Sequence, residues 1–495
     1  MMIHFNTRSS EDYQTFLQVR RCPVYRFDGT SVYVPDEYAS RLGMESQSVT
    51  DTEYQPIEGM FDYQRDITSL AIQKKQYAIF ADCGLGKTLM LLEFARHVAS
   101  VNRGGQVLIV CPLMVVSQTI AEAQRWYGES ISIGQVRAMD LQYWLESGDS
   151  LNTQIAVTNY ESIRDGLRPG DLCGLILDES SMLKSHYGEY GNRLIELGRD
   201  VTWKLCATGT PAPNDRIEFA NHAVFLNRAR TVNEFLATYF INRGETQNRW
   251  ELKPHALKPF YRSLADWSIF LTNPATYGWK DNVGTTPPIH IHIDNIELTP
   301  EQRKAAQQLT GSLITNSVGG IGDRGKLSQI AKGKNGIPTL KPQFIRGLVD
   351  SWPDESTIIW CHYNDEQDQM QQTFPDAVSI SGDTPEDKRL RYIDAFKRGE
   401  VKVLISKPKI LGFGLNLQIC TRQIFSGLKD SYEEFYQAVK RSNRIGSTKP
   451  LNVHIPVTEL EMPFVDNVLR KAHRVEADTL EQESLFKEVG HACIR

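Results

Sequence analysis

Two stretches of the chain alternate short apolar segments with helix-like segments, and this alternation constrains the fold most. Residues 51–221 contain the apolar segments YAIFA, QVLIVCP, QIAVTN, GLILDES and WKLCATGT. From about residue 289 follow IHIHIDNIEL, STIIWCHY, AVSISG, VKVLIS, RQIFSG and LNVHIPV. Apolar strands that alternate with helices are typical of parallel sheets covered on both faces. The sequence therefore predicts an α/β protein with two parallel-sheet lobes in tandem.

Three further segments lack this alternation. The segment VYRFDGTSVYVP alternates around Asp28-Gly29, which is a hairpin signal. HAVFLNRARTVNEFLATYFI and KPFYRSLADWSIFL are predicted to be aromatic-rich helices, and TTPP ends that region. The expected parts are a small accessory unit (1–50), lobe 1 (51–221), a helical insertion (222–288), lobe 2 (289–457) and a C-terminal helical segment (458–495).

Composition narrows the class of protein. The chain has 495 residues, 41% of them apolar, and a formal net charge of −5. Its eight cysteines form no C-x-x-C pair, so neither a zinc site nor a disulfide framework is expected. Apolar runs stay short of the about 18 residues that a membrane helix needs, and MMIHFNTRSSEDY is unlike a signal peptide. These features indicate a cytoplasmic protein with no membrane partner.

The octapeptide ADCGLGKT lies between an apolar strand and a helix-like stretch. It matches the end of the phosphate-loop signature G-x-x-x-x-G-K-[ST], with Ala81 in place of the first glycine. In such a loop, backbone N–H groups and a helix N-terminus face the phosphates of a nucleotide. Lys87 would reach the β- and γ-phosphates, and the hydroxyl of Thr88 would bind Mg²⁺. The alternative is an ordinary glycine-rich turn.

Two acidic residues follow the strand GLIL. Asp178 and Glu179 are expected at the carboxyl edge of the sheet, beside the phosphate loop. Asp178 would bind Mg²⁺, and Glu179 would orient and deprotonate the attacking water. An acid pair facing solvent at a strand end is the plainer alternative. A third segment, ATGTP from Ala207 to Pro211, follows another apolar strand and is either part of this site or only a turn.

The order of these segments resembles the Swi/Snf-type branch of superfamily two helicases and DNA translocases, over about residues 55–457. ADCGLGKT resembles D-E-M-G-L-G-K-T, LDESSMLKS resembles D-E-x-H-x-x-K-N, and ATGTPAPN resembles T-G-T-P-x-x-N. VLIVCPLMVVSQTIAEAQRW resembles the family's element Ia, and VTNYES resembles the element after it. In lobe 2, IELTPEQRKAAQQL, SISGDTPEDKRLRYIDAF, GFGLNLQ and QAVKRSNRIGSTKP resemble the opening segment, the strand and helix after element IV, element V and element VI. The resemblance implies two RecA-like lobes that use ATP and Mg²⁺.

The resemblance also implies residue roles. Lys87, Asp178 and Glu179 are joined as catalytic residues by Arg441 and Arg444, which resemble arginine fingers from lobe 2. Because these arginines are three residues apart, they would share one helix face; a solvated basic face is the alternative. Thr88 and Asp178 would hold the metal. The nucleotide-binding set is Gln64, Asp82, Cys83, Gly84, Leu85, Gly86, Lys87, Thr88, Leu89, Gly414 and Asn416.

Two departures from the family affect coupling between its elements. The family histidine after the acid pair is Ser181 here, so a hydroxyl would couple the nucleotide site to ATGTP. The closing glutamine of element VI is Ser447, which changes one expected contact between the lobes.

A nucleic acid is expected to lie along both lobes. Phosphate contacts require N–H, hydroxyl or cationic groups, and the candidates are Pro112, Ser117, Gln118, Thr158, Asn159, Tyr160, Lys184, Lys407 and Lys409. The basic stretch 388–409 and the glycine- and lysine-rich segment 323–336, expected to be a loop, are either part of this surface or only solvated. In the accessory unit, Arg20, Arg21, Tyr25 and Arg26 would grip DNA or recognise a junction; alternatively the unit covers a sheet edge.

Three functions fit these residues. The first is an ATP-driven translocase on duplex or branched DNA, favoured over RNA. The second is a strand-separating helicase at forks or junctions. The third is an ATP-dependent binding switch without processive motion, which would not need all five catalytic residues. We expect a monomer without chromatin-reading modules, which suggests a compact bacterial or phage form. Sequence preference should be weak, and affinity for the polymer should fall steeply with salt.

Overall fold

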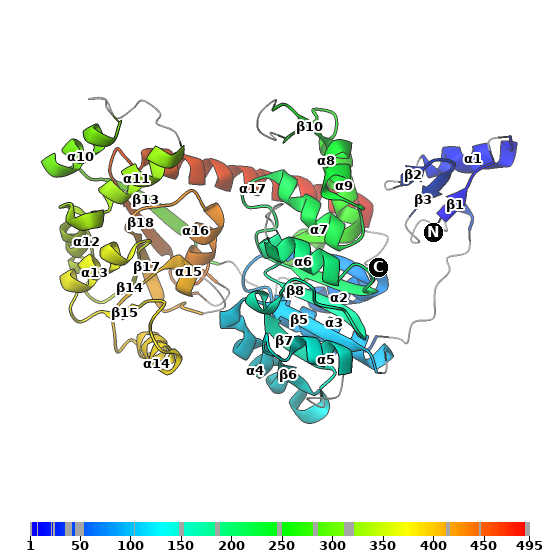
Figure 1. The fold of residues 1–495 in the computed structure, drawn as a ribbon, viewed down its shortest axis with the longest axis horizontal. Helices are drawn as coiled ribbons and strands as arrows, with labels where there is room; N and C mark the ends of the chain where they lie inside the picture. The colour runs from blue at the N-terminus through cyan, green and yellow to red at the C-terminus, as the bar shows by residue number, and fades with distance from the viewer. Residues whose placement is uncertain are drawn as a thin grey trace. The chain divides into compact units, whose positions relative to one another are not determined.

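The computed structural model describes residues 2–6, 8–20, 22, 25–34, 42–44, 54–102, 104–147, 153–183, 189–244, 250–280, 286–310, 321–411, 416–444 and 447–490. Two compact units are present (Figure 1). The first comprises Met1–Asn282 with Val475–Arg495, and the second comprises Val283–Arg474. Each unit is built around one large parallel sheet, which confirms the predicted α/β class.

The sheet of the first unit has seven parallel strands in the order β12-β4-β9-β8-β5-β7-β6. Most of these strands are buried along their whole length, because helices cover both faces of the sheet (Figure 1). The strands are β4 (Gln76–Ala81), β5 (Gln106–Cys111), β6 (Ile133–Gln135), β7 (Ile155–Asn159), β8 (Leu172–Asp178), β9 (Trp203–Ala207) and β12 (Ser268–Leu271).

Alternate strand residues divide between two apolar layers. Phe80, Leu108 and Leu177 belong to a core that also contains Trp144 and Phe260 from two covering helices. The opposite side chains pack toward the helices that follow β4 and β5. The helices of this unit are α2 (Asp62–Lys74), α3 (Lys87–Val101), α4 (Val116–Tyr127), α5 (Leu141–Ser147), α6 (Glu189–Leu197), α7 (Phe219–Phe225), α8 (Val232–Tyr239) and α9 (Leu257–Trp267). Short 3₁₀ turns lie at Leu113–Val115, Gly128–Ser130, Tyr160–Ser162, Ser180–Leu183, Arg216–Glu218 and Pro274–Tyr277.

The region predicted to be wholly helical is only partly so, which corrects the sequence analysis. A hairpin of β10 (Phe240–Asn242) and β11 (Trp250–Leu252) follows α8. The segment expected to remain helical through Leu271 leaves the helix after Trp267, and Ser268–Leu271 pairs in parallel with β4 as an edge strand. A run of three apolar residues, Ile269–Leu271, fits a buried helix or a buried strand equally well, so the sequence pattern could not distinguish the two.

The first residues of the chain form a small antiparallel sheet of β1 (Met2–His4), β3 (Ser31–Tyr33) and β2 (Arg26–Asp28), joined by α1 (Ser10–Val19). The predicted hairpin is confirmed, and its turn contains Gly29 with a φ of +60°. The rings of Phe5, Phe16 and Phe27 pack together within this small sheet.

The second unit has six parallel strands in the order β13-β18-β17-β14-β16-β15. All six coincide with predicted apolar segments: β13 (Ile289–Asn295), β14 (Ser356–Trp360), β15 (Val378–Ile380), β16 (Val403–Ser406), β17 (Cys420–Phe425) and β18 (Leu451–Val457). Its helices are α10 (Pro300–Thr310), α11 (Ile321–Ala331), α12 (Lys341–Asp350), α13 (Asn364–Thr373), α14 (Glu386–Lys397), α15 (Pro408–Leu411) and α16 (Tyr432–Val439), and a 3₁₀ turn lies at Lys334–Gly336. Helix α11 corrects the expected loop at 323–336.

The predicted C-terminal helix is confirmed as α17 (Met462–Gly490), drawn in red in Figure 1. It begins within the second unit, and its last residues belong to the first. There Asp478 forms an ion pair of 2.5 Å with Arg216, and Glu483 accepts hydrogen bonds from the backbone N–H (3.0 Å) and hydroxyl (2.6 Å) of Thr272. Along the described residues, no helix is both long and apolar enough to cross a bilayer.

Candidate functional site

The strand order of the first sheet brings the predicted nucleotide elements together. Strands β4, β9 and β8 are neighbours, and the phosphate loop, ATGTP and the acid pair follow their carboxyl ends in that order. Strands β5 and β7, whose ends carry the predicted nucleic-acid elements, continue the same edge. One sheet edge therefore holds the nucleotide elements on one half and the polymer elements on the other, in agreement with the rule that ligands bind at the carboxyl ends of parallel strands.

The loop ADCGLGKT adopts a conformation that its glycines permit. Gly84 and Gly86 have φ values of +88° and +68°, and Gly86 is the N-cap of α3. A Cβ at Gly86 would lie 2.1 Å from Nε2 of Gln64, so this position admits no other residue without rearrangement. The ammonium of Lys87 donates to the backbone oxygens of Ala81 (2.8 Å) and Asp82 (3.1 Å). The helix N-terminus and the lysine thus lie at one end of the loop, as phosphate binding requires.

The helix before β4 supports the loop. Gln64 is buried, and its amide donates to the backbone oxygen of Leu85 at 3.5 Å. The phenol of Tyr63 donates to the same oxygen at 3.1 Å. Phe61 stacks on Tyr63 with ring centroids 5.8 Å apart, so an aromatic surface adjoins the loop. Tyr63 and Gln64 together resemble the family element before the phosphate loop, but only Gln64 was predicted to bind the nucleotide.

The two carboxylates after β8 have different environments. Asp178 is 7% exposed, and burial, followed by the negative charge of Glu179, raises its pKa to about 7, although Lys87 opposes the shift. Glu179 has a φ of +53°, an uncommon conformation for a non-glycine residue. Its Oε2 accepts a hydrogen bond of 3.1 Å from the hydroxyl of Thr208. The strained backbone and the threonine together fix where this carboxylate lies.

Residues of ATGTP connect the acid pair to the phosphate loop. The hydroxyl of Thr208 also accepts from the backbone N–H of Thr210 at 3.1 Å. A Cβ added at Gly209 would lie 3.4 Å from the backbone oxygen of Ala81, so the two loops are in close proximity. Thr208 was quoted in the sequence analysis without a role, and the structure adds it to the site.

The position of the family histidine is occupied differently here. Ser181 is buried, and its hydroxyl donates to the backbone oxygen of Glu179 at a long 3.5 Å. The preceding Ser180 pairs with Nε2 of the buried His222 at 3.1 Å. Burial lowers the pKa of His222 to about 4, so this imidazole is neutral. No sequence pattern pointed to His222, because it lies 42 residues downstream of Ser180, on α7.

The donor set of this edge fits a magnesium–nucleotide complex. Mg²⁺ prefers oxygen ligands and is commonly held by one or two carboxylates together with nucleotide phosphates. Asp178 supplies a carboxylate and Thr88 a hydroxyl at the first turn of α3. When bound, the ion neutralises charge on the phosphates. Asp82 and Cys83 lie in the loop, where the N–H of Cys83 bonds Oδ1 of Asp82 at 2.6 Å, and Leu89 is buried in α3.

Predicted nucleic-acid residues of the first unit fall into three groups. Pro112 caps the 3₁₀ turn after β5, and Ser117 and Gln118 are exposed on α4. Thr158 and Tyr160 are buried and donate to the backbone oxygens of Val136 (2.7 Å) and Asp178 (2.8 Å), which corrects the prediction that these two side chains contact a polymer. Asn159 lines a hollow of about 300 Å³, whose rim includes the exposed Arg137 that sequence reasoning missed. Lys184 lies outside the described residues.

The arginines of element VI do not lie on a helix. Helix α16 ends at Val439, so the prediction that Arg441 and Arg444 share a helix face is wrong. The chain turns there because the backbone oxygen of Arg441 accepts from the N–H of Leu417 (2.9 Å), and Ser447 closes a turn onto Arg444 (2.9 Å). Arg441 is 2% exposed, and Arg444 is half-buried. Of element V, Asn416 is exposed, whereas Gly414 lies outside the described residues.

Lysines gather at the carboxyl ends of β14 and β17. The ammonium groups of Lys332, Lys334 and Lys429 lie 5.8, 5.7 and 5.2 Å from the ring centroid of Tyr363. These distances are within reach of cation–π attraction. Lys407 bonds Asn364 nearby, and Lys409 pairs with Glu434 at 3.7 Å while remaining largely exposed. This edge of the second sheet is therefore rich in cations that the sequence scattered over about a hundred positions.

The phosphate loop, the strand-end acid pair and their shared sheet edge define a P-loop nucleoside-triphosphate-binding lobe. Family comparison makes the assignment specific. The SNF2-related domain matches residues 63–264, and the helicase conserved C-terminal domain matches residues 340–446. The chain belongs to the Snf2-type branch of helicase superfamily two.

Relatives agree with this assignment at low identity. The ATP-dependent DNA helicase DDM1 of Arabidopsis thaliana is 23% identical over 76% of this chain and 55% of its own length. The DNA annealing helicase and endonuclease ZRANB3 of Bos taurus is 22% identical over 80% of this chain and 38% of its own length. This chain thus spans about half or less of these relatives. Among solved structures, the Sulfolobus solfataricus SWI2/SNF2 ATPase core in complex with double-stranded DNA is 20% identical and covers 89% of this chain and 98% of its own, with a TM-score of 0.39.

Proposed function

We propose that this chain hydrolyses ATP and uses the energy to move along, or remodel, duplex or branched DNA. The observation that carries the proposal is the shared carboxyl edge of the first sheet, where Lys87, Asp178 and Glu179 meet beside strand ends suited to polymer contacts. Membership of the Snf2-type branch supports DNA as the polymer, since relatives carry the name of DNA helicase.

Each residue at this edge has a chemical part. Lys87 exchanges its bonds to Ala81 and Asp82 for the phosphate oxygens of ATP. Glu179, held by Thr208, orients the attacking water and accepts its proton. Asp178 and Thr88 would hold Mg²⁺. Gln64 and the aromatic rings beside it lie where the nucleotide base is expected.

The second unit completes the reaction in this proposal. Arg444 is the stronger candidate for a finger on the γ-phosphate, because its side chain is only half-buried, whereas Arg441 is 2% exposed and better placed to hold the turn. A guanidinium of this kind accelerates phosphoryl transfer by about 10³- to 10⁵-fold. Because ATP and product would favour different arrangements of the two units, hydrolysis can drive movement along the polymer.

The polymer surface extends over strand-end residues of both sheets. Ser117, Gln118 and Asn159 offer polar groups in the first unit. In the second unit Lys334, Lys407, Lys409 and Lys429 offer charge, whereas Lys332 is buried and paired with Glu461. These groups recognise phosphates and carry no base information. We therefore expect weak sequence preference and a steep loss of affinity with salt.

The decisive experiment measures ATP turnover without polymer and with duplex DNA, single-stranded DNA, forked DNA and RNA. Stimulation by duplex DNA is expected of the translocase. Release of a strand from forks would assign a strand-separating helicase instead, and no response to any polymer would assign a binding switch. The proposal also includes a monomer in the cytoplasm of a bacterium or a phage-infected host; the free cysteines among the described residues support a reducing compartment.

A further inference from the structure

A large pocket lies at the edge of the first sheet opposite the nucleotide site. It has a volume of about 810 Å³, within the range of ligand sites. Arg228, which lines it, bonds the backbone oxygen of Gln76 at the start of β4 (2.9 Å), whereas the phosphate loop follows the other end of that strand. Six residues of strand separate the two by about 20 Å, so this pocket is distinct from the ATP site.

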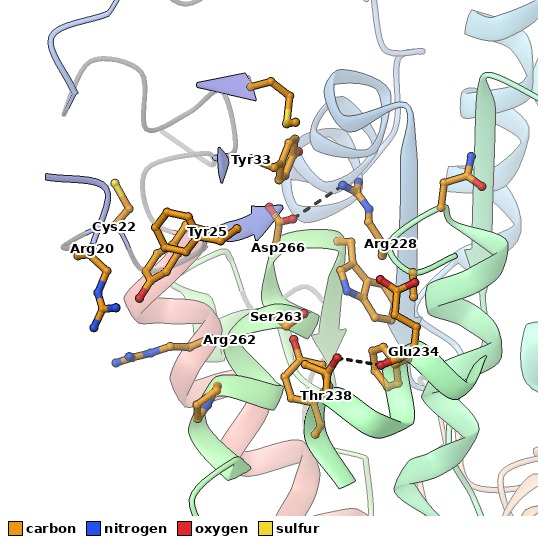
Figure 2. A pocket seen from close by; sticks show the side chains of 18 residues that line it. Arg20, Cys22, Tyr25, Tyr33, Arg228, Glu234, Thr238, Arg262, Ser263 and Asp266 are labelled. Atoms are coloured by element: carbon orange, nitrogen blue, oxygen red, sulfur yellow. Dashed lines mark hydrogen bonds and ion pairs between the residues drawn. The ribbon is translucent and has the colours of Figure 1, made fainter. Parts of the chain in front are cut away.

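Two parts of the chain form the walls of the pocket (Figure 2). The small N-terminal sheet contributes Arg20, Tyr25, Phe27 and Tyr33, and helices α8 and α9 contribute residues that include Arg262 and Asp266. In Figure 2, Arg20, Tyr25 and Arg262 lie toward the same end of the pocket. The cavity thus exists only because the N-terminal sheet faces these helices.

Aromatic rings on the N-terminal side form a supported platform. Tyr25 meets Phe27 edge-on with centroids 5.4 Å apart, and Phe27 is backed by Phe16 at 5.4 Å. Phe27 is nevertheless 37% exposed, although so small a unit has few apolar side chains with which to build a core. An aromatic face kept accessible in this way offers stacking to a planar ligand.

Positive side chains outnumber negative ones in the lining of the pocket. Three arginines and two carboxylates line it. Both carboxylates are already engaged: Asp266 with Lys74 (3.0 Å) and Arg228 (3.8 Å), and Glu234 with the backbone N–H of Arg230 (2.7 Å). Arg20 and Arg262 come from separate segments and lie toward the same end of the pocket as Tyr25 (Figure 2), so both guanidinium groups can reach phosphates next to a base stacked on that ring.

We propose that this pocket binds an unpaired nucleotide of a single strand, such as one displaced from duplex DNA. A base inside a duplex has both faces stacked, so only an unpaired base can lie on Tyr25. A strand also carries phosphates next to that base, which Arg20 and Arg262 can bind together. The proposal rests on the proposed function, because it names the DNA structure, a junction with unpaired bases, that the same enzyme would engage.

The test measures binding of the full chain to a fluorescent 12-nucleotide single strand and to a blunt duplex by anisotropy. Tyr25→Ala is expected to weaken single-strand binding about tenfold, the loss of one stacked base, and to change duplex binding less than twofold. Tyr25→Phe should retain the affinity, and Arg262→Gln, on the other wall, should weaken it. Tyr13→Ala is the matched control, because Tyr13 is 59% exposed on helix α1 of the same N-terminal segment and does not line the pocket.

Several outcomes would overturn the proposal. Equal weakening on both polymers would make the contact a general electrostatic one. A lower melting temperature with unchanged affinities would make the N-terminal sheet a cover for the edge of lobe 1. Competition by free thymidine monophosphate as effective, per nucleotide, as by the strand would assign a mononucleotide site.

The same preparation separates this proposal from the proposed function. If duplex DNA stimulates ATP turnover but single-strand binding ignores Tyr25→Ala, the pocket proposal fails and the translocase stands. If no polymer stimulates turnover but single-strand binding depends on Tyr25, the translocase fails and the pocket stands. Lys87→Ala should lose turnover while keeping the single-strand affinity.

Discussion

The two carboxylates after β8 lie in different environments, although they belong to adjacent residues. Asp178 is buried in the strand end, whereas Glu179 turns into a positive-φ conformation and meets Thr208. The pattern Asp-Glu after an apolar strand was readable in the sequence. The burial of Asp178 and the threonine partner of Glu179 come from other elements of the fold, Thr208 being 29 residues away, so no local pattern could have contained them.

Glu179→Gln should keep ATP binding and lose turnover by about 10²- to 10⁴-fold, the usual loss with a general base. The amide is nearly the same size and still accepts from Thr208, but it cannot take a proton from water. Single-turnover hydrolysis and nucleotide binding are measured on the same protein. Glu196→Gln, an exposed acid on α6, is the control; normal turnover in Glu179→Gln would remove this residue from the site.

The affinity for magnesium–ATP should fall as the pH drops below about 7. The pKa of Asp178 is raised to about 7 by burial and by Glu179, so below that pH the carboxyl is protonated, and Mg²⁺ must displace the proton. The apparent affinity should then fall up to about tenfold per pH unit. Titration calorimetry with a non-hydrolysable analogue at pH 6, 7 and 8 measures this.

Asp178→Asn is the control for that titration. It removes the protonation of the Asp178 carboxyl, whereas the nucleotide phosphate still titrates. Its affinity should be weak at every pH. An identical pH profile in the two proteins would show that the carboxyl of Asp178 does not bind the metal.

Helix α3, which follows the phosphate loop, also carries Glu93, whose carboxylate accepts hydrogen bonds from the segment before α2. Glu93 is fully buried and accepts from the phenols of Tyr54 and Tyr127 (both 2.8 Å), the N–H of Ile57 (3.1 Å) and Arg96 (2.7 Å). Burial alone would raise the pKa of Glu93, but hydrogen bonds from Arg96, Tyr54 and Tyr127 outweigh it, and the pKa is lowered.

Glu93→Ala should lower the unfolding free energy of the first unit by about 3 kcal/mol, because it leaves several buried donors unpaired. The native contribution is complete above the ordinary pKa of 4.5 and is lost as the pH falls through the lowered folded-state value. Thermal unfolding between pH 4 and pH 8 should therefore show the largest difference from wild type at pH 8. Glu129→Ala, at an exposed site, should leave stability unchanged.

Helices and strands could be predicted where the sequence pattern was long or was bounded by turn residues. All eleven apolar segments expected to be strands coincide with strands of the two sheets, since each is an apolar run bounded by turn residues. Strand β12 was missed because three apolar residues after α9 do not specify a period. Helix α16 was extended too far because QAVKRSNRIG continues a helical pattern, and only the backbone bond from Leu417 to Arg441 shows why it stops.

At the scale of the whole molecule, helix α17 links the two units through one continuous element. Asp478→Asn should remove the ion pair with Arg216 and lower the melting temperature of the first unit by a few degrees, equivalent to about 1–2 kcal/mol. Glu476→Gln changes the same charge at an exposed position of the same helix and should have no effect. Equal melting of the two variants would mean that this pair does not anchor the helix.

The end of α17 also affects the order in which the two units can complete their folding during translation. Leu485 belongs to the apolar core of the first unit, and Phe486 meets Tyr277 with centroids 5.5 Å apart. A ribosome has therefore already synthesised every strand of the second unit before it delivers the residues that finish the first. The core of the nucleotide-binding lobe therefore stays incomplete while nearly two hundred further codons are translated. During that interval chaperones can bind its exposed apolar surface.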